Sequence, residues 1–157
     1  MLTRDDFLFV VDKAPLVAVD LVFIRNASEV LLGKRLNQPA QGYWFVPGGR
    51  IRKGEPMADA VIRVAGAELG LEDQFRSGQL APRLIGACEH FYSDCFAGDC
   101  GIGTHYVVLG HRIDVAESFE PLAIDSQHAE WRWWPLNEAL IADSVHRYTK
   151  NYLTLEG

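Results

Sequence analysis

One segment of the chain carries residues whose types and spacing suit the binding of a cation and a phosphate group. Residues 48–71 read GGRIRKGEPMADAVIRVAGAELGL. Two glycines and a basic loop come first, and a helical stretch that carries the carboxylate of Glu68 follows. A flexible loop that leads into a helix offers backbone N–H groups to phosphate, and carboxylate oxygens are ligands for divalent cations. The segment therefore predicts a site for a metal-bound phosphate compound.

The segment resembles the Nudix box, the signature of hydrolases that act on nucleoside diphosphates linked to another group. The resemblance implies the α/β (α+β) class and the Nudix fold, a mixed β-sheet sandwiched between helices. It also implies that Glu55 and Arg63 form a structural pair, which holds the loop against the helix. The matching positions of the box are Gly49, Glu55, Arg63, Glu68, Gly70 and Leu71.

The segment also departs from the common box, which has acids where this chain has Val64 and Ala67. Residue 64 precedes residue 68 by one helical turn, so acids at both positions would share one face of the helix. In the family, the acids at these two positions and at position 68 form a metal-binding cluster. This chain keeps only Glu68 of the three. This reduced box resembles the GDP-mannose mannosyl hydrolase branch of the family, as do the segments PAQGYWFVPGGR, EHFY and THYVVLG.

The resemblance to this branch implies one Mg²⁺ ion in each subunit, with Mn²⁺ as an alternative. One carboxylate can hold such an ion when a backbone carbonyl and a neutral side chain complete the set. The implied ligands are the carbonyl of Gly48, the carboxylate of Glu68 and the amide oxygen of Gln127. The resemblance also implies a homodimer, in which the N-terminal segment could cross between subunits.

Two arginines and a histidine are the candidates for the chemical step. Arg35 and Arg50 suit the diphosphate, because the planar guanidinium offers paired donors to phosphate oxygens. His128 follows Gln127 directly, and a histidine titrates near neutral pH, as a general base for water should. Taken alone, His128 would more often be a solvent-exposed loop residue, and each arginine an exposed member of a salt bridge.

Further candidates are assigned to the sugar and the base. Asp20 interrupts an apolar run, where a carboxylate is costly unless it is paired or hydrogen-bonded. It is interpreted either as an outward-facing or salt-bridged acid, or as a catalytic contact to the sugar, which the resemblance favours. The resemblance also places His90 and Tyr106 near the substrate, although both could be satisfied core residues. The plausible stacking groups for guanine are Phe7, Phe9 and Tyr43.

With a single carboxylate for the metal, displacement at carbon is the favoured chemistry. The anomeric carbon of a nucleotide sugar carries the diphosphate, and its C–O bond can break through an oxocarbenium-like transition state once charge on the leaving GDP is absorbed. Direct attack by water would invert the anomeric centre. The sequence thus predicts hydrolysis of GDP-α-D-mannose, and of GDP-glucose as a further candidate, to GDP and free sugar. The alternatives are a pyrophosphohydrolase that cleaves phosphorus–oxygen bonds and an inactive nucleotide-sugar sensor.

Hydrophobic patterning predicts the elements that position these residues. A capped N-terminal helix should precede a valine-rich central strand, and the box helix should be followed by a polar connection at residues 71–80. The predicted helices cover residues 3–13, 57–69, 136–142 and 144–155, and the predicted strands cover residues 16–25, 30–35, 84–92, 104–115 and the stretch around 126–136, with a short aromatic strand before residue 47.

Length and composition bound the remaining possibilities. A chain of 157 residues with 48% apolar residues suits one domain, taken as residues 1–157. It has no run of about 18 to 20 apolar residues and no secretory signal pattern at its start, so a cytoplasmic protein without a membrane segment is expected. The net charge of −6 argues against nonspecific binding of nucleic acid. Three cysteines without a CxxC pair, Cys88, Cys95 and Cys100, fit a reducing compartment.

Overall fold

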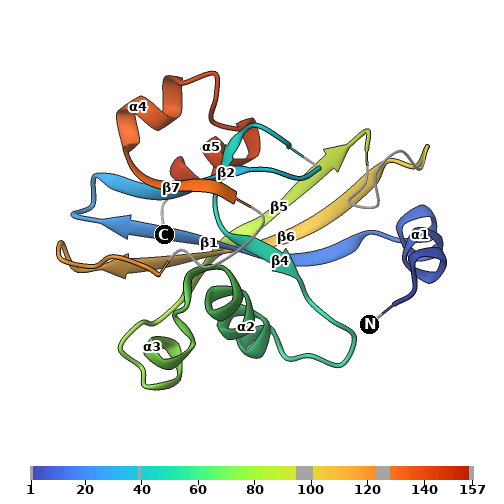
Figure 1. The fold of residues 1–157 in the computed structure, drawn as a ribbon, viewed down its shortest axis with the longest axis horizontal. Coiled ribbons are helices and arrows are strands. Elements are labelled where there is room, and N and C mark those ends of the chain that lie inside the picture. The colour runs from blue at the N-terminus through green and yellow to red at the C-terminus, as the bar shows by residue number, and fades with distance from the viewer. Residues whose placement is uncertain (1, 39, 95–100, 123–127, 156–157) are drawn as a thin grey trace.

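A mixed β-sheet lies at the centre of the molecule, between two layers of helices (Figure 1). The structure is a computed structural model, and it describes residues 2–38, 40–94, 101–122 and 128–155. The strands within these residues form one sheet, in which β3, β2, β1, β6 and β5 are neighbours in that order, while β4 pairs with β1 and β7 pairs with β2. Their bounds are β1 (Leu16–Arg25), β2 (Glu29–Arg35), β3 (Trp44–Phe45), β4 (Gly48–Arg50), β5 (Arg83–Tyr92), β6 (Thr104–Val115) and β7 (His128–Pro135).

Strand β1 is buried on both faces, which explains its nearly continuous apolar sequence. Val19, Leu21 and Phe23 pack in the core beneath the box helix, whereas Ala18, Val22 and Ile24 belong to the core on the opposite face. β1 pairs in parallel with β6 and antiparallel with β2 and β4. Asp20 therefore lies in the middle of the sheet, on the same face of β1 as Ala18 and Val22.

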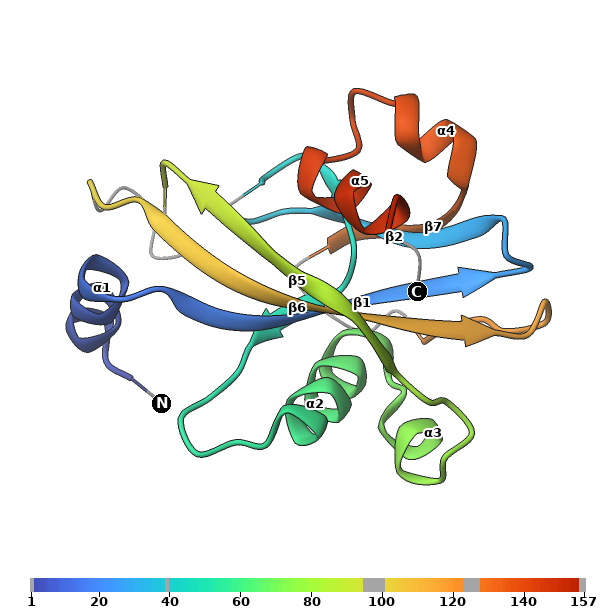
Figure 2. The same ribbon diagram turned by 180° about the vertical axis from the view of Figure 1, so that it is seen from behind.

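The two faces of the sheet are covered by different helices (Figures 1 and 2). The box helix α2 (Met57–Leu69) and α3 (Glu72–Arg76) lie on one face, and α4 (Leu136–Ile141) and α5 (Arg147–Leu153) lie on the other. Helix α2 ends at Gly70, whose left-handed backbone (φ 68°) closes the helix as a C-terminal glycine commonly does. These layers confirm the predicted mixed β-sheet sandwiched between helices.

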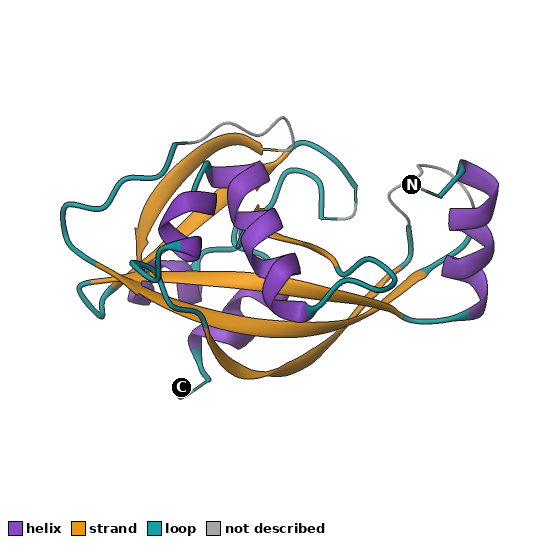
Figure 3. Cartoon of the chain, turned by 90° about the horizontal axis from the view of Figure 1, so that it is seen from below, coloured by secondary structure: helices purple, strands orange, loops and turns teal. Residues whose placement is uncertain are grey.

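Helix α1 (Arg4–Lys13) stands apart from both layers, at one end of the sheet (Figure 3). The Thr3 hydroxyl accepts a hydrogen bond from the Asp6 backbone N–H at 3.2 Å, which caps the helix as predicted. Phe7 and Val11 are buried in a small separate core, and this core also includes Leu16 at the start of β1. The helix thus packs on its own chain.

Two local predictions need correction. Residues 71–80 were predicted to be a polar connection, but they contain helix α3 and bury Phe75 and Leu80. The Phe75 ring meets the Phe23 ring edge-on at 6.4 Å, so isolated apolar residues in a polar stretch anchor this helix to the core. The paired glycines were expected in a loop, whereas they begin strand β4. Among the described residues, no helix has the length and hydrophobicity that a membrane crossing requires.

Candidate functional site

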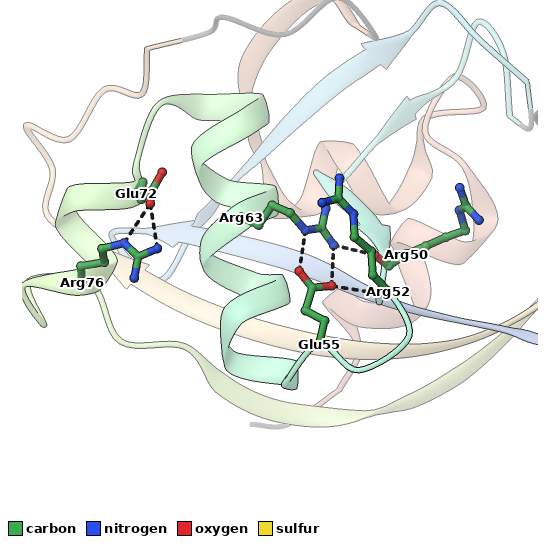
Figure 4. A network of polar contacts seen from close by, with 6 residues as sticks. All are labelled: Arg50, Arg52, Glu55, Arg63, Glu72 and Arg76. Carbon is green, nitrogen blue, oxygen red and sulfur yellow. Dashed lines mark hydrogen bonds and ion pairs between the residues drawn. The ribbon is translucent and has the colours of Figure 1, made fainter. Parts of the chain in front are cut away.

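The loop before the box helix is held by the ion pair of Glu55 and Arg63 (Figure 4). Arg63 Nε donates to Glu55 Oε1 at 2.6 Å, and its Nη2 donates to Glu55 Oε2 at 2.8 Å and to the Arg50 carbonyl at 2.7 Å. The Arg52 backbone N–H also donates to Glu55 Oε2, at 2.8 Å. The hydrogen bonds from Arg63 lower the pKa of Glu55 to about 2. The pair thus connects α2 to the segment that carries Arg50.

The two positions where the common box has acids differ in their surroundings. Val64 is buried, and a Cβ added at Gly49 would lie 2.9 Å from its Cγ2 atom, so the valine packs directly on the β4 backbone. Ala67, in contrast, is exposed. Glu68 follows Val64 by one helical turn and is buried as well. The helix therefore presents an apolar contact and one carboxylate towards the sheet.

Glu68 and Gly48 supply the kinds of oxygen donor that Mg²⁺ prefers, a carboxylate and a backbone carbonyl. Within the described residues, no three His, Cys, Asp or Glu side chains gather in a way that could hold a metal. Glu68 and Gly48 are thus candidate oxygen donors for a site with one carboxylate and neutral ligands. The third predicted ligand, Gln127, lies outside the described residues.

Asp20 lies directly opposite Gly48 in the antiparallel pair of β1 and β4. A Cβ on Gly48 would overlap Asp20 Oδ1, so this oxygen occupies the space that the glycine leaves open. Oδ2 accepts a hydrogen bond of 2.7 Å from the hydroxyl of Tyr152 in α5. Burial raises the pKa of Asp20 to about 7, although the Tyr152 hydrogen bond and the charge of Arg35 oppose the rise. Asp20 is thus inward-facing and hydrogen-bonded.

His90 on β5 joins this network from the other side. Its Nε2 lies 3.2 Å from the Tyr152 hydroxyl, and its ring stacks on Tyr148, with centroids 4.2 Å apart and an angle of 3° between the planes. Burial lowers the pKa of His90 to about 4, and the nearby His146 adds to the effect. The imidazole is therefore neutral near pH 7 and acts here as a hydrogen-bonding group.

Tyr106 marks the region in which both predicted arginines lie. Its pKa is raised by burial, while the charges of Arg50 and Arg35 act in the opposite direction. The Arg50 guanidinium also stands 4.4 Å from the ring centroid of Phe7 in α1. His90 pairs with Tyr106 across β5 and β6. Arg35, Arg50, His90 and Tyr106, which come from four different strands, therefore lie in one region of the sheet.

His128 begins β7, opposite Arg35 in the pair of β2 and β7. It is buried, and its ring lies 4.4 Å from the ring of Trp131. A Cβ on Gly33 would come within 2.6 Å of His128 Cδ2 and 2.8 Å of Trp131, so the histidine ring rests on the glycine backbone. The alternative of a solvent-exposed loop histidine is therefore wrong. His128 is instead buried and paired with Arg35, which is predicted to bind the diphosphate.

The three aromatic candidates for guanine stacking do not share one environment. Phe7 is buried beneath Arg50, Phe9 is 66% exposed on α1, and Tyr43 meets His146 edge-on with ring centroids 5.1 Å apart. Tyr148 and Tyr152 were not predicted from the sequence, and they contact His90 and Asp20 from α5. Their spacing of four residues, which places both on one helical face, was the available signal.

A comparison with protein families matches the NUDIX domain to residues 14–154. The chain belongs to the Nudix family. It is 38% identical, over 152 residues, to the low-salt glycan biosynthesis protein Agl8 of Haloferax volcanii, a match that covers 95% of this chain and 86% of that protein. It is also 40% identical over 63 residues to an ADP-ribose pyrophosphatase of Methanocaldococcus jannaschii, which covers 40% of this chain and 37% of that protein.

Solved Nudix structures share the fold at lower sequence identity. A MutT Nudix hydrolase of Burkholderia pseudomallei superposes with a TM-score of 0.69 at 23% identity, covering 92% of this chain and 100% of that one. The NUDIX domain of Shewanella oneidensis NrtR, solved with ADP-ribose, gives a TM-score of 0.67 at 20% identity over 97% of this chain and 95% of that one. This Nudix hydrolase thus has the family's fold with a depleted set of box acids.

Proposed function

We propose that this Nudix hydrolase cleaves GDP-α-D-mannose to GDP and free mannose, by inverting displacement at the anomeric carbon. GDP-glucose is the second substrate to be tested. The proposal includes the homodimer, the cytoplasmic location and the single domain over residues 1–157 that were expected from the sequence. It is supported chiefly by the packing of Val64, a buried valine at a position where the common box has an acid.

This packing bears on the bond that is cleaved. Attack of water at phosphorus in Nudix enzymes relies on several cations, and several cations need several carboxylates. Here the buried position beside Gly49 is apolar, and Glu68 follows one turn later. When bound by Glu68, Gly48 and Gln127, Mg²⁺ would supply charge neutralisation on the departing diphosphate. That role suits departure of GDP from carbon.

The protein's own side chains account for the remaining charge. The charges of Arg35 and Arg50 both act on Tyr106, which supports the proposal that their guanidinium groups bind the diphosphate together. As the C–O bond to GDP breaks, positive charge grows at the anomeric carbon, and the carboxylate of Asp20 would stabilise it. Water forms the new bond to carbon and transfers its proton to His128 as general base.

The relatives support the class of substrate, but they give less support to mannose as the particular sugar. The name of the Haloferax relative connects that protein with glycan biosynthesis, which favours a sugar-containing substrate here. The shorter match to an ADP-ribose pyrophosphatase favours the competing reaction, cleavage between the two phosphates. The two reactions leave different products, so product analysis separates them.

The test is hydrolysis of GDP-mannose and GDP-glucose in water labelled with oxygen-18, with Mg²⁺ and with EDTA. The proposal expects GDP and labelled free sugar, with the β anomer appearing first by NMR, and no turnover in EDTA. Label in a phosphate group, together with GMP and sugar phosphate, would establish the pyrophosphohydrolase instead. Binding of GDP-mannose with Mg²⁺ but without release of sugar over hours would indicate a nucleotide-sugar sensor.

A further inference from the structure

Helix α5 reaches the site through two tyrosines that lie one turn apart. Tyr148 holds the edge strand, because its hydroxyl accepts a hydrogen bond from the Phe91 N–H at 2.8 Å and donates to the Phe91 carbonyl at 2.9 Å. Tyr152 lies deeper, with 2% of its surface exposed, and its hydroxyl meets both Asp20 and His90. Tyr148 is thus hydrogen-bonded to the backbone of β5, whereas Tyr152 is within hydrogen-bond distance of the side chains of two predicted site residues.

The hydrogen bonds around Tyr152 have a defined direction. A tyrosine hydroxyl has one proton to donate, and an ionised carboxylate can only accept. When Asp20 is ionised, the Tyr152 proton therefore points to Asp20 Oδ2, at 2.7 Å, and His90 donates its Nε2 proton to the Tyr152 oxygen, at 3.2 Å. The chain runs from His90 through Tyr152 to Asp20, and it requires the neutral imidazole with its proton on Nε2.

Asp20 is consequently fixed at both oxygens. Oδ1 lies in the space left by the missing side chain of Gly48, and Oδ2 is held by Tyr152. The stack of His90 on Tyr148 holds the imidazole plane, so the donor end of the chain is fixed as well. Side chains restrained in this way lose little freedom when substrate binds, and small displacements of such groups are costly in rate.

We propose that Tyr152 is a positioning residue, which orients the Asp20 carboxylate for catalysis through the hydrogen-bond chain from His90. The C-terminal helix, outside the Nudix box, would then form part of the catalytic apparatus. The inference rests on the proposed function only in assigning Asp20 to the reaction. The chain of hydrogen bonds can be tested without any substrate.

The first test measures the chain directly. In protein with nitrogen-15 in its histidine rings, NMR at pH 9, where Asp20 is ionised, should show His90 neutral with its proton on Nε2. Tyr152→Phe keeps the buried ring and removes the hydroxyl, so the Nε2 resonance of His90 should shift and its proton should exchange faster with water. A wild-type His90 with its proton on Nδ1, or a resonance unchanged in Tyr152→Phe, would overturn the inference. This result does not depend on which substrate the enzyme uses.

The second test asks whether Tyr152 acts through Asp20. Tyr152→Phe should lower kcat by about 10- to 100-fold, with KM changed less than about threefold, because a misplaced carboxylate affects the transition state more than binding. Combined with Asp20→Asn, Tyr152→Phe should lower kcat no further, because the group that it positions is already gone. Effects that multiply in the double variant, or an unchanged kcat in Tyr152→Phe, would overturn the inference.

Tyr148→Phe is the matched control. It removes a hydroxyl from the same helix and leaves the His90 stack. That hydroxyl is hydrogen-bonded to the backbone of Phe91 and accepts a hydrogen bond from Arg147 Nη2 at 3.2 Å. It should lower the free energy of unfolding by about 1 kcal/mol while kcat stays within about threefold of wild type. If GDP-sugars are not hydrolysed, the proposed function fails, and the NMR test still decides the arrangement of Tyr152.

Discussion

Asp20 and Gly48 face each other across β1 and β4, and the carboxylate of one occupies the space where the other lacks a side chain. This contact brings an acid from the central strand against the residue that precedes the first glycine of the box. Gly48 is also the residue whose carbonyl is proposed to bind Mg²⁺. Any side chain at position 48 would therefore disturb both groups at once.

Gly48→Ala should abolish most of the activity. The added Cβ would overlap Asp20 Oδ1 and come within 3.0 Å of the Val19 carbonyl, so the strand or the carboxylate must move. We expect kcat to fall by about 100-fold or more and the protein to lose about 1 to 3 kcal/mol of stability. Steady-state kinetics and urea unfolding measure the two effects.

Gly66→Ala is the matched control, because its Cβ would meet the Glu72 Cβ at 3.1 Å, a contact that a shift of a few tenths of an ångström at the exposed start of α3 would relieve. Its helical position should gain from alanine, by up to about 1 kcal/mol. Equal losses of activity in the two variants would contradict the special role of Gly48.

Gly33→Ala should impair His128 without changing the histidine itself. The added Cβ would come within 2.6 Å of the His128 ring, which must tilt away from its place beside Trp131. If His128 is the general base, His128→Ala should lower kcat by roughly 10²- to 10⁴-fold. Gly33→Ala should then lower kcat in the same direction by about 10-fold or more, with KM little changed. Full activity in His128→Ala would remove this residue from the mechanism.

The Glu55–Arg63 pair should make stability depend on pH at the acidic end. The pKa of Glu55 is lowered from 4.5 to about 2 by the Arg63 hydrogen bonds, so the folded protein releases this proton more readily than the unfolded chain does. The stabilisation is therefore present above pH 4.5 and is lost as pH falls towards 2. Glu55→Gln should cost about 1 to 2 kcal/mol at pH 7 and clearly less at pH 3, measured by urea unfolding.

Glu72 and Arg76 form the control pair, 2.8 Å apart on α3 and both more than half exposed (Figure 4). Exposed pairs at this helical spacing contribute about 0.3 to 0.5 kcal/mol. Glu72→Gln should therefore have a small effect at both pH values. A cost for Glu55→Gln that matches the one for Glu72→Gln would show that the loop is held by other contacts.

Asp20→Asn should stabilise the protein at high pH while it inactivates the enzyme. Burial raises the pKa of Asp20 from 3.8 to about 7, so the folded state holds this proton more tightly than the unfolded chain. Its contribution to stability is present below pH 3.8 and is lost as pH rises through about 7. Asparagine keeps an acceptor for Tyr152 without the charge. In EDTA we expect the free energy of unfolding to increase by about 2 to 4 kcal/mol at pH 8 and to change little at pH 4, as measured by urea unfolding. Equal differences at the two pH values would contradict the raised pKa of Asp20.

Val64→Glu should restore one acid of the common box at a high cost in stability. The position is buried against Gly49, so a carboxylate there is desolvated and overpacked, and we expect a loss of about 3 kcal/mol or more. Ala67→Glu places an acid at an exposed position and should stay within about 0.5 kcal/mol of wild type. Product analysis should still find free sugar in both variants, whereas release of sugar phosphate would show that the missing acids alone set the reaction.

Much of the architecture could be predicted from the sequence, because periodicity and end signals are local. The box helix begins and ends at Met57 and Leu69 as predicted, and the strands Leu16–Arg25 and Thr104–Val115 have the predicted bounds. The box departure at residues 64 and 67 could also be read directly. Helix α3 was missed because five residues with one buried phenylalanine give too little periodic signal.

The sequence by itself determined which groups are available: one box carboxylate for a metal, two arginines, a histidine and an unexpected acid in the central strand. Only the tertiary structure decided which of them meet. Tyr152 and Asp20 are 132 residues apart along the chain, and Tyr152 and His90 are 62 apart. Their contacts depend on the parallel register of β1 and β6 and on the packing of α5, and no local pattern encodes such pairings. The glycines at 33 and 48 likewise acquire their meaning only when another strand places a histidine or a carboxylate in the space they leave.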